Sequence, residues 1–387
     1  MKPMVVKRIE INGYRGIDEV ELTFDGWINI FVGRNNTGKS SILEAIMLAA
    51  SAPNQYYDLL NNDLLEILRE RIGLGREKYL VNLKKSFARV AISFDDGLRS
   101  ETIIGLPERI QRADKEWIKD SVSILERLIA EKKQKMRELI EEKYREYTEA
   151  RKTPDYLITR RLRERFREVE HEYKPIMNFI TRLQDSLWFA IYTPEGVKRF
   201  TQGTASDLIF IGKGSLLPIS SLYDMLIRRG LIPVIIDDLR KDIEYLVDLR
   251  RVENELMVFL NWLNEPLPLQ LMGDGFREIL RLALVVSIPR RERGLLILLE
   301  EPERNLHPGY IELVTDYIAK VANEERAQFF ISTHSNEFVE SLVDKATKVS
   351  SVFRMYREFD GKITYEQFTG FESKESMTEI KEDLRGI

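Results

Sequence analysis

The stretch Gly33-Arg34-Asn35-Asn36-Thr37-Gly38-Lys39-Ser40 decides the fold of this chain. It fits the pattern G-x-x-x-x-G-K-[ST], and the mostly apolar segment before it, residues 27–32, is typical of a buried strand. After it, apolar residues recur at the spacing of one helix face, namely Ile42, Ala45, Ile46 and Ala49. A strand, a glycine-rich turn and a helix in this order predict a backbone that wraps its N–H groups around phosphates.

The residues of this turn have separate predicted roles. Lys39 is expected to reach the β- and γ-phosphates, and the Ser40 hydroxyl to bind Mg²⁺. The other residues expected at the nucleotide are Gly33, Asn35, Asn36, Thr37, Gly38 and Ser41. The sequence therefore predicts ATP and Mg²⁺ as cofactors. The alternative is a glycine turn that only caps a helix.

A second motif follows a continuous apolar run, residues 295–299, which is typical of a buried parallel strand. The run ends in Glu300-Glu301-Pro302-Glu303. Adjacent carboxylates at a buried strand end are costly unless a cation or a catalytic task uses them. Glu300 is expected to hold Mg²⁺ opposite Ser40, and Glu301 to orient or deprotonate the attacking water. A strand that simply opens onto a solvated acidic loop is the alternative.

A third motif, Ile331-Ser332-Thr333-His334-Ser335, follows the apolar pair Phe329-Phe330. His334 is one of three histidines, and at a strand end it can donate a hydrogen bond to a γ-phosphate. A lone histidine is more often structural. The interpretation as a γ-phosphate sensor depends on its position roughly thirty residues after the carboxylate pair.

In this order, the three motifs resemble those of the ABC-type ATPases of the SMC, RecF and OLD-like group. The likeness is greatest to compact stand-alone members without a C-terminal nuclease domain, and it covers about residues 1–50 and 268–342. The resemblance implies an α/β P-loop NTPase fold. It also implies that two protomers bind ATP between them, so that the signature segment of one completes the phosphate site of the other.

The resemblance assigns roles residue by residue. Lys39 and Ser40 take the Walker A positions, Glu300 the Walker B magnesium position, Glu301 the catalytic glutamate and His334 the switch histidine. Arg15 follows the first strand, in the family's arginine turn. Arg304, Asn305 and Leu306 stand where the D-loop crosses the dimer interface.

The signature segment, residues 271–277, departs from the family pattern. Gly273 stands where a serine is usual, so a hydroxyl contact to the γ-phosphate is missing. The N–H groups of Gly273 and Gly275 at a helix start can still bind an anion. We therefore expect weaker dimerisation than in relatives with the serine. The magnesium-sensing glutamine of many ABC proteins is not identified, with Gln55 a candidate only.

The charge pattern predicts an insertion in the ATPase domain. Residues 1–105 and 187–387 are assigned to the two parts of that domain, and residues 106–186 to an antiparallel helical hairpin. Apolar residues at alternating spacings of four and three form a coiled-coil seam from Leu162 to Leu183. Without cysteine, the hairpin cannot carry a zinc hook.

Five arginines lie close together on the return arm of this hairpin, at positions 160, 161, 163, 165 and 167. They could contact the phosphates of DNA or RNA. The alternative is a solvated helix face whose arginines pair with neighbouring glutamates. Toward the C-terminus, a helix is expected over Leu239–Leu263, and a β-hairpin with its turn at Asp360-Gly361.

Composition excludes several classes of protein. The 387 residues hold no cysteine, which excludes disulfides and thiolate metal sites. No apolar run reaches the roughly 20 residues that span a bilayer, so a cytoplasmic protein is expected. The net charge of −4 gives no general attraction to nucleic acid. A charged fraction of 32% suits a thermophile.

These patterns predict a Mg²⁺-dependent ATPase that forms a homodimer around ATP and acts on DNA or on a DNA-processing partner. The alternative is a weakly hydrolysing, nucleotide-gated regulatory subunit of a nuclease or defence complex. A small-molecule kinase is a third class. The carboxylate pair and His334 count against it, because they place water rather than an acceptor at the γ-phosphate.

Overall fold

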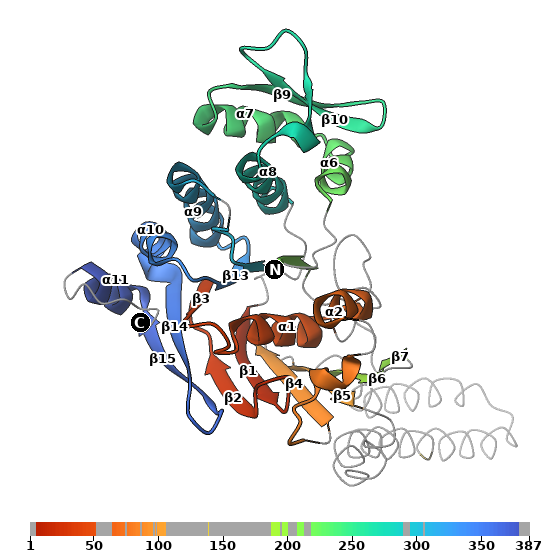
Figure 1. The fold of residues 1–387 in the computed structure, drawn as a ribbon, viewed down its shortest axis with the longest axis vertical. Helices are drawn as coiled ribbons and strands as arrows, with labels where there is room; N and C mark the ends of the chain where they lie inside the picture. The colour runs from red at the N-terminus through yellow and green to blue at the C-terminus, as the bar shows by residue number, and fades with distance from the viewer. Residues whose placement is uncertain are drawn as a thin grey trace, which may run out of the picture. The chain divides into compact units, whose positions relative to one another are not determined.

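The computed structural model describes residues 5–51, 64–73, 76–85, 87–95, 97, 99–105, 138, 187–193, 196–199, 207–212, 218–288, 295–304 and 306–378 (Figure 1). The chain divides into two units, residues 1–105 with 189–387 and residues 106–188. Apart from Glu138, the helical hairpin predicted for residues 106–186, with its arginine cluster, lies outside the described residues. It stays a prediction, as do the proposed domain boundaries.

The main sheet has six strands in the order β15-β14-β3-β13-β12-β8. Their bounds are Ile363–Thr369, Ser350–Arg357, Ile28–Val32, Gln328–Ser332, Leu295–Glu300 and Asp207–Ile211. Neighbouring strands are parallel except β14 and β15. Every residue of β3 and β13 is buried, which explains why both strands are mostly apolar. The mixed α/β fold with a parallel sheet, predicted from the P-loop context, is confirmed.

The register of this sheet determines where the motifs meet. Glu300 at the end of β12 pairs with Ser332 at the end of β13, and Ser332 pairs with Phe31 of β3. Because the strands are parallel, their carboxyl ends share one edge, where the following loops carry the glycine-rich turn, the carboxylates and the histidine. Ligands of open α/β sheets bind at this edge.

A second six-stranded sheet has the order β2-β1-β4-β5-β6-β7. Its strands span Glu19–Thr23, Val6–Asn12, Phe87–Phe94, Arg99–Gly105, Leu187–Thr193 and Gly196–Arg199. Helix α1, Lys39–Ala50, contacts β4 and β5 of this sheet and β12 and β13 of the main sheet (Figure 1). A helix between two sheets is covered on both sides. Its predicted apolar stripe is therefore only part of a helix that is buried almost all round, Glu44 included.

The predicted helix Leu239–Leu263 is wrong. Helix α7, Ile232–Asp242, ends early, and a β-hairpin follows with strands β9, Leu246–Val252, and β10, Glu255–Leu260. Alternate residues of β10 are buried, which is strand periodicity. The turn contains neither glycine nor proline. It uses Glu253 with a φ of 53°, a left-handed conformation that gives no strong signal in the sequence.

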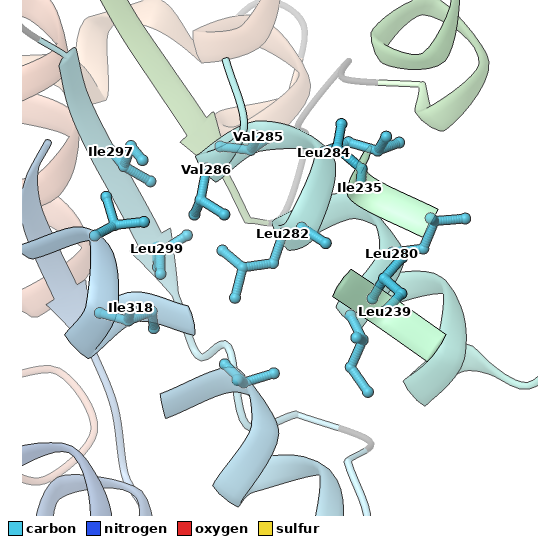
Figure 2. Packing of buried hydrophobic residues seen from close by; sticks show 14 of the residues in the cluster. Ile235, Leu239, Leu280, Leu282, Leu284, Val285, Val286, Ile297, Leu299 and Ile318 are labelled. Carbon is cyan, nitrogen blue, oxygen red and sulfur yellow. The ribbon is translucent and has the colours of Figure 1, made fainter. Parts of the chain in front are cut away.

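Helix α8, Asp274–Val286, connects this region to the main sheet. Its apolar side chains lie on two sides in Figure 2. Leu282 and Val286 lie toward Ile297 and Leu299 of β12 and Ile318 of α9, Pro308–Asn323, while Leu280 and Leu284 lie toward Ile235 and Leu239 of α7. The start of α8, where the signature segment was predicted, is thereby held by the packing of one continuous core.

Several smaller elements complete the described chain. They are α2, Leu64–Ile72; α6, Ile219–Ile227; β11, Leu267–Pro268; α10, Asn336–Ala346; and α11, Gly370–Thr378, with short 3₁₀ turns at Glu77–Leu80, Leu269–Leu271 and Thr347–Val349. The predicted C-terminal β-hairpin is confirmed as β14 and β15, with Gly361 at a φ of 89° in the turn. Within the described residues, none of the helices has the length and apolar character needed to cross a membrane.

Candidate nucleotide site

A cavity of about 320 Å³ lies beside the turn between β3 and α1. Its walls combine that turn with the residues after β1 and at the ends of β12, β13 and β14. The lining residues are Arg15, Gly16, Asn35, Asn36, Thr37, Gly38, Lys39, Ser40, Ser41, Glu301, Ser332, His334 and Arg357. The structure thus places most of the predicted nucleotide-binding residues around one space.

Lys39 occupies the base of the glycine-rich turn. Its Nζ donates hydrogen bonds to the carbonyl oxygens of Gly33 and Arg34 at 2.7 and 2.8 Å. The side chain is buried, and this burial lowers the pKa of Lys39 to about 8, although the carboxylates of Glu301 and Glu303 act in the opposite direction. Two neutral carbonyls compensate the ammonium only partly. Phosphate oxygens in the cavity would be much stronger partners.

The turn depends on backbone conformations that favour glycine. Gly33 has a φ of 140° and Gly38 a φ of 95°. A Cβ atom at Gly33 would lie 2.4 Å from the carbonyl oxygen of Met355 on β14, so the neighbouring strand also requires glycine there. The Thr37 hydroxyl donates to the Arg34 carbonyl at 2.9 Å and closes the turn. The turn is therefore shaped before any ligand binds.

Glu301 and His334 lie close together on the lining of the cavity. The Nε2 atom of His334 lies 3.6 Å from the Oε1 atom of Glu301, and about a third of each side chain is exposed. The Glu301 backbone, with a φ of 49°, donates its N–H to the Ser332 carbonyl at 2.8 Å. This left-handed turn directs the residue after β12 toward the end of β13. The two residues predicted to act on the γ-phosphate are thus brought together.

Glu303 connects the two strand ends. Its Oε1 accepts hydrogen bonds from the Thr333 hydroxyl at 2.7 Å and from the His334 backbone N–H at 3.0 Å. Burial raises the pKa of Glu303 above its usual range, although both hydrogen bonds stabilise the charged form. Its Oε2 is buried and makes no hydrogen bond within the described residues. Glu303 therefore contacts the backbone of His334, a contact that the sequence motif did not reveal.

Glu300 is not among the residues that line this cavity. It was expected opposite Ser40, but its carboxylate oxygens accept hydrogen bonds from Arg71 at 2.8 and 2.9 Å. Ser40 lines the cavity together with Glu301, while Glu300 does not line it. Nothing in the sequence around Arg71, on α2, indicates this pairing.

Two arginines lie on the cavity wall. Arg15, as predicted, follows β1; it has a φ of 50° and is hydrogen-bonded to Glu44. Arg357, at the end of β14, was not predicted. It donates to the carbonyl oxygens of Asn36 at 2.6 Å, Gly16 at 3.2 Å and Gly361 at 2.9 Å. It joins the C-terminal hairpin to the phosphate turn across more than 300 residues, and no local sequence pattern signals such a contact.

The predicted signature glycines lie at a helix start, outside the cavity. Gly273 precedes the first residue of α8, and the space around it is open, with no atom within 4 Å of the position of a Cβ. A Cβ at Gly275 would meet the ring of Tyr310 at 3.0 Å. Arg304 is exposed, and Asn305 lies outside the described residues.

The oxygen-rich wall of the cavity fits a magnesium ion. The Ser40 hydroxyl and the Glu301 carboxylate are both hard oxygen donors, which Mg²⁺ prefers. Mg²⁺ usually keeps several waters and takes one or two carboxylates together with substrate phosphates, so Ser40 and Glu301 are the candidate protein ligands on this wall. Glu300 would join them only if its carboxylate left Arg71.

Comparison with known proteins identifies the family. The family described as "AAA domain, putative AbiEii toxin, Type IV TA system" matches residues 28–340. The chain belongs to this AAA-domain family. The match runs from β3 through the glycine-rich turn, the carboxylates and His334 into α10. The predicted membership among SMC/RecF-like ABC-type ATPases is confirmed.

Two relatives of this AAA-domain protein match shorter stretches, and one solved structure covers most of the chain at low identity. An uncharacterized protein of Methanocaldococcus jannaschii is 32% identical over 117 residues, which is 30% of this chain and all of the relative. The DNA replication and repair protein RecF of Oceanobacillus iheyensis is 37% identical over 87 residues, 22% of this chain and 19% of RecF. The Smc head domain of Pyrococcus furiosus, solved bound to the C-terminal domain of ScpA, gives a TM-score of 0.47 at 14% identity, covering 98% of this chain and 100% of that one.

Proposed function

We propose that this protein hydrolyses ATP in a Mg²⁺-dependent reaction, and that ATP binding joins two copies of the chain. The observation that carries the proposal is that Glu301 and His334 lie side by side on a cavity that Lys39 also lines. A carboxylate is suited to accept a hydrogen bond from the water that attacks a γ-phosphate, and a neighbouring imidazole is suited to donate a hydrogen bond to that phosphate.

Each residue then has a physical task. Lys39 would exchange its two carbonyl partners for phosphate oxygens, and the N–H groups of the turn would bind the remaining oxygens. Glu301 would accept a proton from the attacking water or orient it. His334, held through its backbone by Glu303, would donate to the γ-phosphate. Mg²⁺ would neutralise charge on the β- and γ-phosphates, with Ser40 among its ligands.

The position of the signature glycines supports ATP-gated dimerisation. Gly273 and Gly275 lie at the start of a 13-residue helix, where free N–H groups favour an anion, but they do not line their own cavity. A second copy of the chain could bring this helix start to the γ-phosphate. Without a serine at Gly273, the contact relies on backbone N–H groups alone. We therefore expect a dimer that is weak unless hydrolysis is blocked.

A role on DNA, or with a DNA-processing partner, completes the proposal. Support comes from the names of two relatives: the RecF protein above, and a DNA double-strand break repair Rad50 ATPase of Archaeoglobus fulgidus that is 44% identical over 46 residues. The chain spans 19% and 5% of these two proteins, so their activities stand here as proposals only. The second candidate is a slowly hydrolysing regulatory subunit, which the engagement of Glu300 by Arg71 favours.

The test measures phosphate release from ATP and, in the same samples, the molar mass of the protein in solution. Wild-type protein with ATP, Mg²⁺ and water alone should release phosphate, and Lys39→Ala should release none. Light scattering on Glu301→Gln with ATP and Mg²⁺ should give the mass of two chains, returning to one when nucleotide is removed. No phosphate release and no ATP binding by the wild type would refute the ATPase. A Glu301→Gln protein that stays monomeric at tens of micromolar would refute dimerisation alone.

A further inference from the structure

Glu300, which the sequence motif predicts at the magnesium ion, is engaged by another residue. Its Oε2 and Oε1 atoms accept hydrogen bonds from the two terminal nitrogens of Arg71, at 2.8 and 2.9 Å. Only 11% of the Glu300 side chain and 7% of the Arg71 side chain are exposed. A bidentate pair of charged groups shielded from water is a strong interaction. Both carboxylate oxygens that a metal could use already have a partner.

The pair occupies a space built for it. The Arg71 guanidinium lies over the ring of Phe210 on β8, 5.1 Å from the ring centroid. Gly212, just after β8, leaves room for the carboxylate, since a Cβ there would lie 2.8 Å from the Oε2 of Glu300. Phe210 lies on β8, the strand that pairs with β12, and Gly212 directly follows that strand. Residues at the end of β8 therefore accommodate both the arginine and the carboxylate, at the edge of the sheet.

Arg71 is also connected to the nucleotide cavity. Its Nε donates to the Oε1 of Glu44 at 2.6 Å. Glu44 is fully buried on α1, and the same carboxylate accepts hydrogen bonds from Arg15, at 2.5 and 2.6 Å, and from the Tyr14 hydroxyl at 3.1 Å. Arg15 lines the cavity with 30% of its side chain exposed. Four charges of alternating sign thus lead from the cavity wall to Glu300, and they sum to zero.

We propose that Arg71 is a latch on the metal site: it holds Glu300 away from Mg²⁺ in the nucleotide-free protein and releases it when phosphates attract Arg15. This inference rests on the proposed function, because it concerns access of the metal to the same site. Arg71 is a positioning residue, since it acts on the metal through Glu300.

The release follows from the shared partner, Glu44. When Arg15 turns to a phosphate, Glu44 loses one of its two cations and binds Arg71 more strongly. The guanidinium is drawn toward Glu44, and its hold on Glu300 weakens. A metal that arrives with the nucleotide can then take the freed carboxylate. In this way an empty cavity holds Mg²⁺ poorly, although its ligands are present.

The experiment uses Mn²⁺ as a spectroscopic substitute for Mg²⁺ and no nucleotide. Free and bound Mn²⁺ are distinguished by electron paramagnetic resonance on the full chain. The double variant Arg71→Met/Glu44→Gln removes the latch and keeps the net charge of the buried set. It should bind Mn²⁺ about 10- to 100-fold more tightly than the wild type, the factor that corresponds to hydrogen bonds with charged groups. Equal affinity in the two proteins would overturn the proposal.

Two single variants test the same idea without removing Arg71. Gly212→Ala places a methyl group against Glu300. It should also tighten Mn²⁺ binding, because the carboxylate is displaced from its position beside Arg71. Arg15→Met imitates the withdrawal of Arg15 and should do the same through Glu44. If the double variant does not fold, the Mn²⁺ affinities of these two single variants test the proposal. Wild-type affinity in both would count against the latch.

A matched control and a separate measurement keep the result specific. Arg89 and Glu101 form another bidentate pair, at 2.7 and 2.9 Å, between β4 and β5. Arg89→Met/Glu101→Gln should leave Mn²⁺ affinity unchanged. Binding of a fluorescent ATP analogue with Mg²⁺ to the wild type tests the proposed function itself. ATP binding with unchanged Mn²⁺ affinity in the variants rejects only the latch, whereas no ATP binding rejects the proposed function.

Discussion

The Nε2 atom of His334 lies 3.6 Å from the Oε1 atom of Glu301. This distance is too long for a hydrogen bond and leaves the carboxylate available to a water molecule. The two side chains come from loops after neighbouring parallel strands, so the register of β12 and β13 sets their separation.

Glu301→Gln is expected to preserve ATP binding and to slow hydrolysis by roughly 10²- to 10⁴-fold, the usual contribution of a general base. Phosphate release at saturating ATP with Mg²⁺ gives the rate, and fluorescence of a bound ATP analogue gives the affinity. Glu337→Gln, on the exposed face of α10, is the control for loss of one carboxylate. Hydrolysis at the wild-type rate by Glu301→Gln would exclude this residue as the base.

The pKa of Lys39, lowered to about 8 by burial, predicts a pH dependence of nucleotide binding. Bound phosphates favour the charged ammonium, so binding raises this pKa and takes up a proton where the free lysine is neutral. Affinity should be constant below pH 8 and fall by up to about tenfold per pH unit above it. Calorimetry in buffers of different ionisation enthalpy would detect the proton. A flat affinity from pH 7 to 9.5 would contradict the assignment.

Glu303 is expected to act through the position of His334. Glu303→Gln keeps an acceptor for the His334 N–H and the Thr333 hydroxyl. Because the folded-state pKa of Glu303 is raised, its charged form costs stability above the unfolded pKa, so the glutamine variant should be as stable as the wild type at pH 7 or more so.

Glu303→Leu, in contrast, leaves both donors without an acceptor. It should lower kcat about tenfold or more and cost about 1–3 kcal/mol of stability. Activity assays and thermal unfolding on the two variants separate positioning from charge. Equal kcat for leucine and glutamine would mean that the hydrogen bonds of Glu303 do not position His334.

Gly33→Ala tests the shape of the phosphate turn. The Cβ atom of the alanine would lie 2.4 Å from the Met355 carbonyl oxygen. The alanine would also have to adopt a φ of 140°, which side chains other than hydrogen disfavour. Gly230, with a φ of 69° and open space, provides a control for the φ cost alone, about 1–2 kcal/mol. Thermal unfolding should show a clearly larger loss for Gly33→Ala. Equal losses of stability in the two variants would mean that β14 shifts to make room for the methyl group at no further cost.

The arginine cluster at residues 160–167 predicts sequence-independent binding to duplex DNA. Arg161→Gln/Arg163→Gln/Arg165→Gln should reduce both the affinity and its salt dependence, by about 0.9 in log–log slope for each lost phosphate contact. Fluorescence anisotropy at several salt concentrations, with and without ATP, gives both values. Arg228→Gln/Arg229→Gln is an exposed control pair. Equal binding by the triple variant would leave the cluster as an ordinary solvated helix face.

Short-range patterns predicted the central part of the site. The glycine-rich turn, β3, α1 and the ends of β12 and β13 were read from runs of fewer than ten residues, because each follows from local periodicity or backbone chemistry. The helix predicted over Leu239–Leu263 failed for the same reason. Its residues Leu239, Ile243 and Leu246 fit a helix face, and the turn at Glu253 uses a residue that rarely marks one.

Contacts between distant residues could not be predicted. Arg71 meets Glu300 across 229 positions and Arg357 meets Asn36 across 321. An isolated arginine has no periodicity and no motif, so only the packing of α2 and the register of β14 specify its partner. For this reason the sequence-based prediction did not include the charged partners Arg71 and Arg357, whereas it did include the residues of the glycine-rich turn that line the cavity.

The central position of β3 also has a consequence for synthesis of the chain. Its two neighbours in the sheet, β13 and β14, follow it by about 300 residues. After residues 33–40 have been synthesised, most of the protein must still be made before the strands that flank this turn exist. Such distant pairings are slow to form and leave apolar strands exposed in the meantime. A nascent chain that stops before residue 328 should have no phosphate-binding turn, although it contains every residue of it.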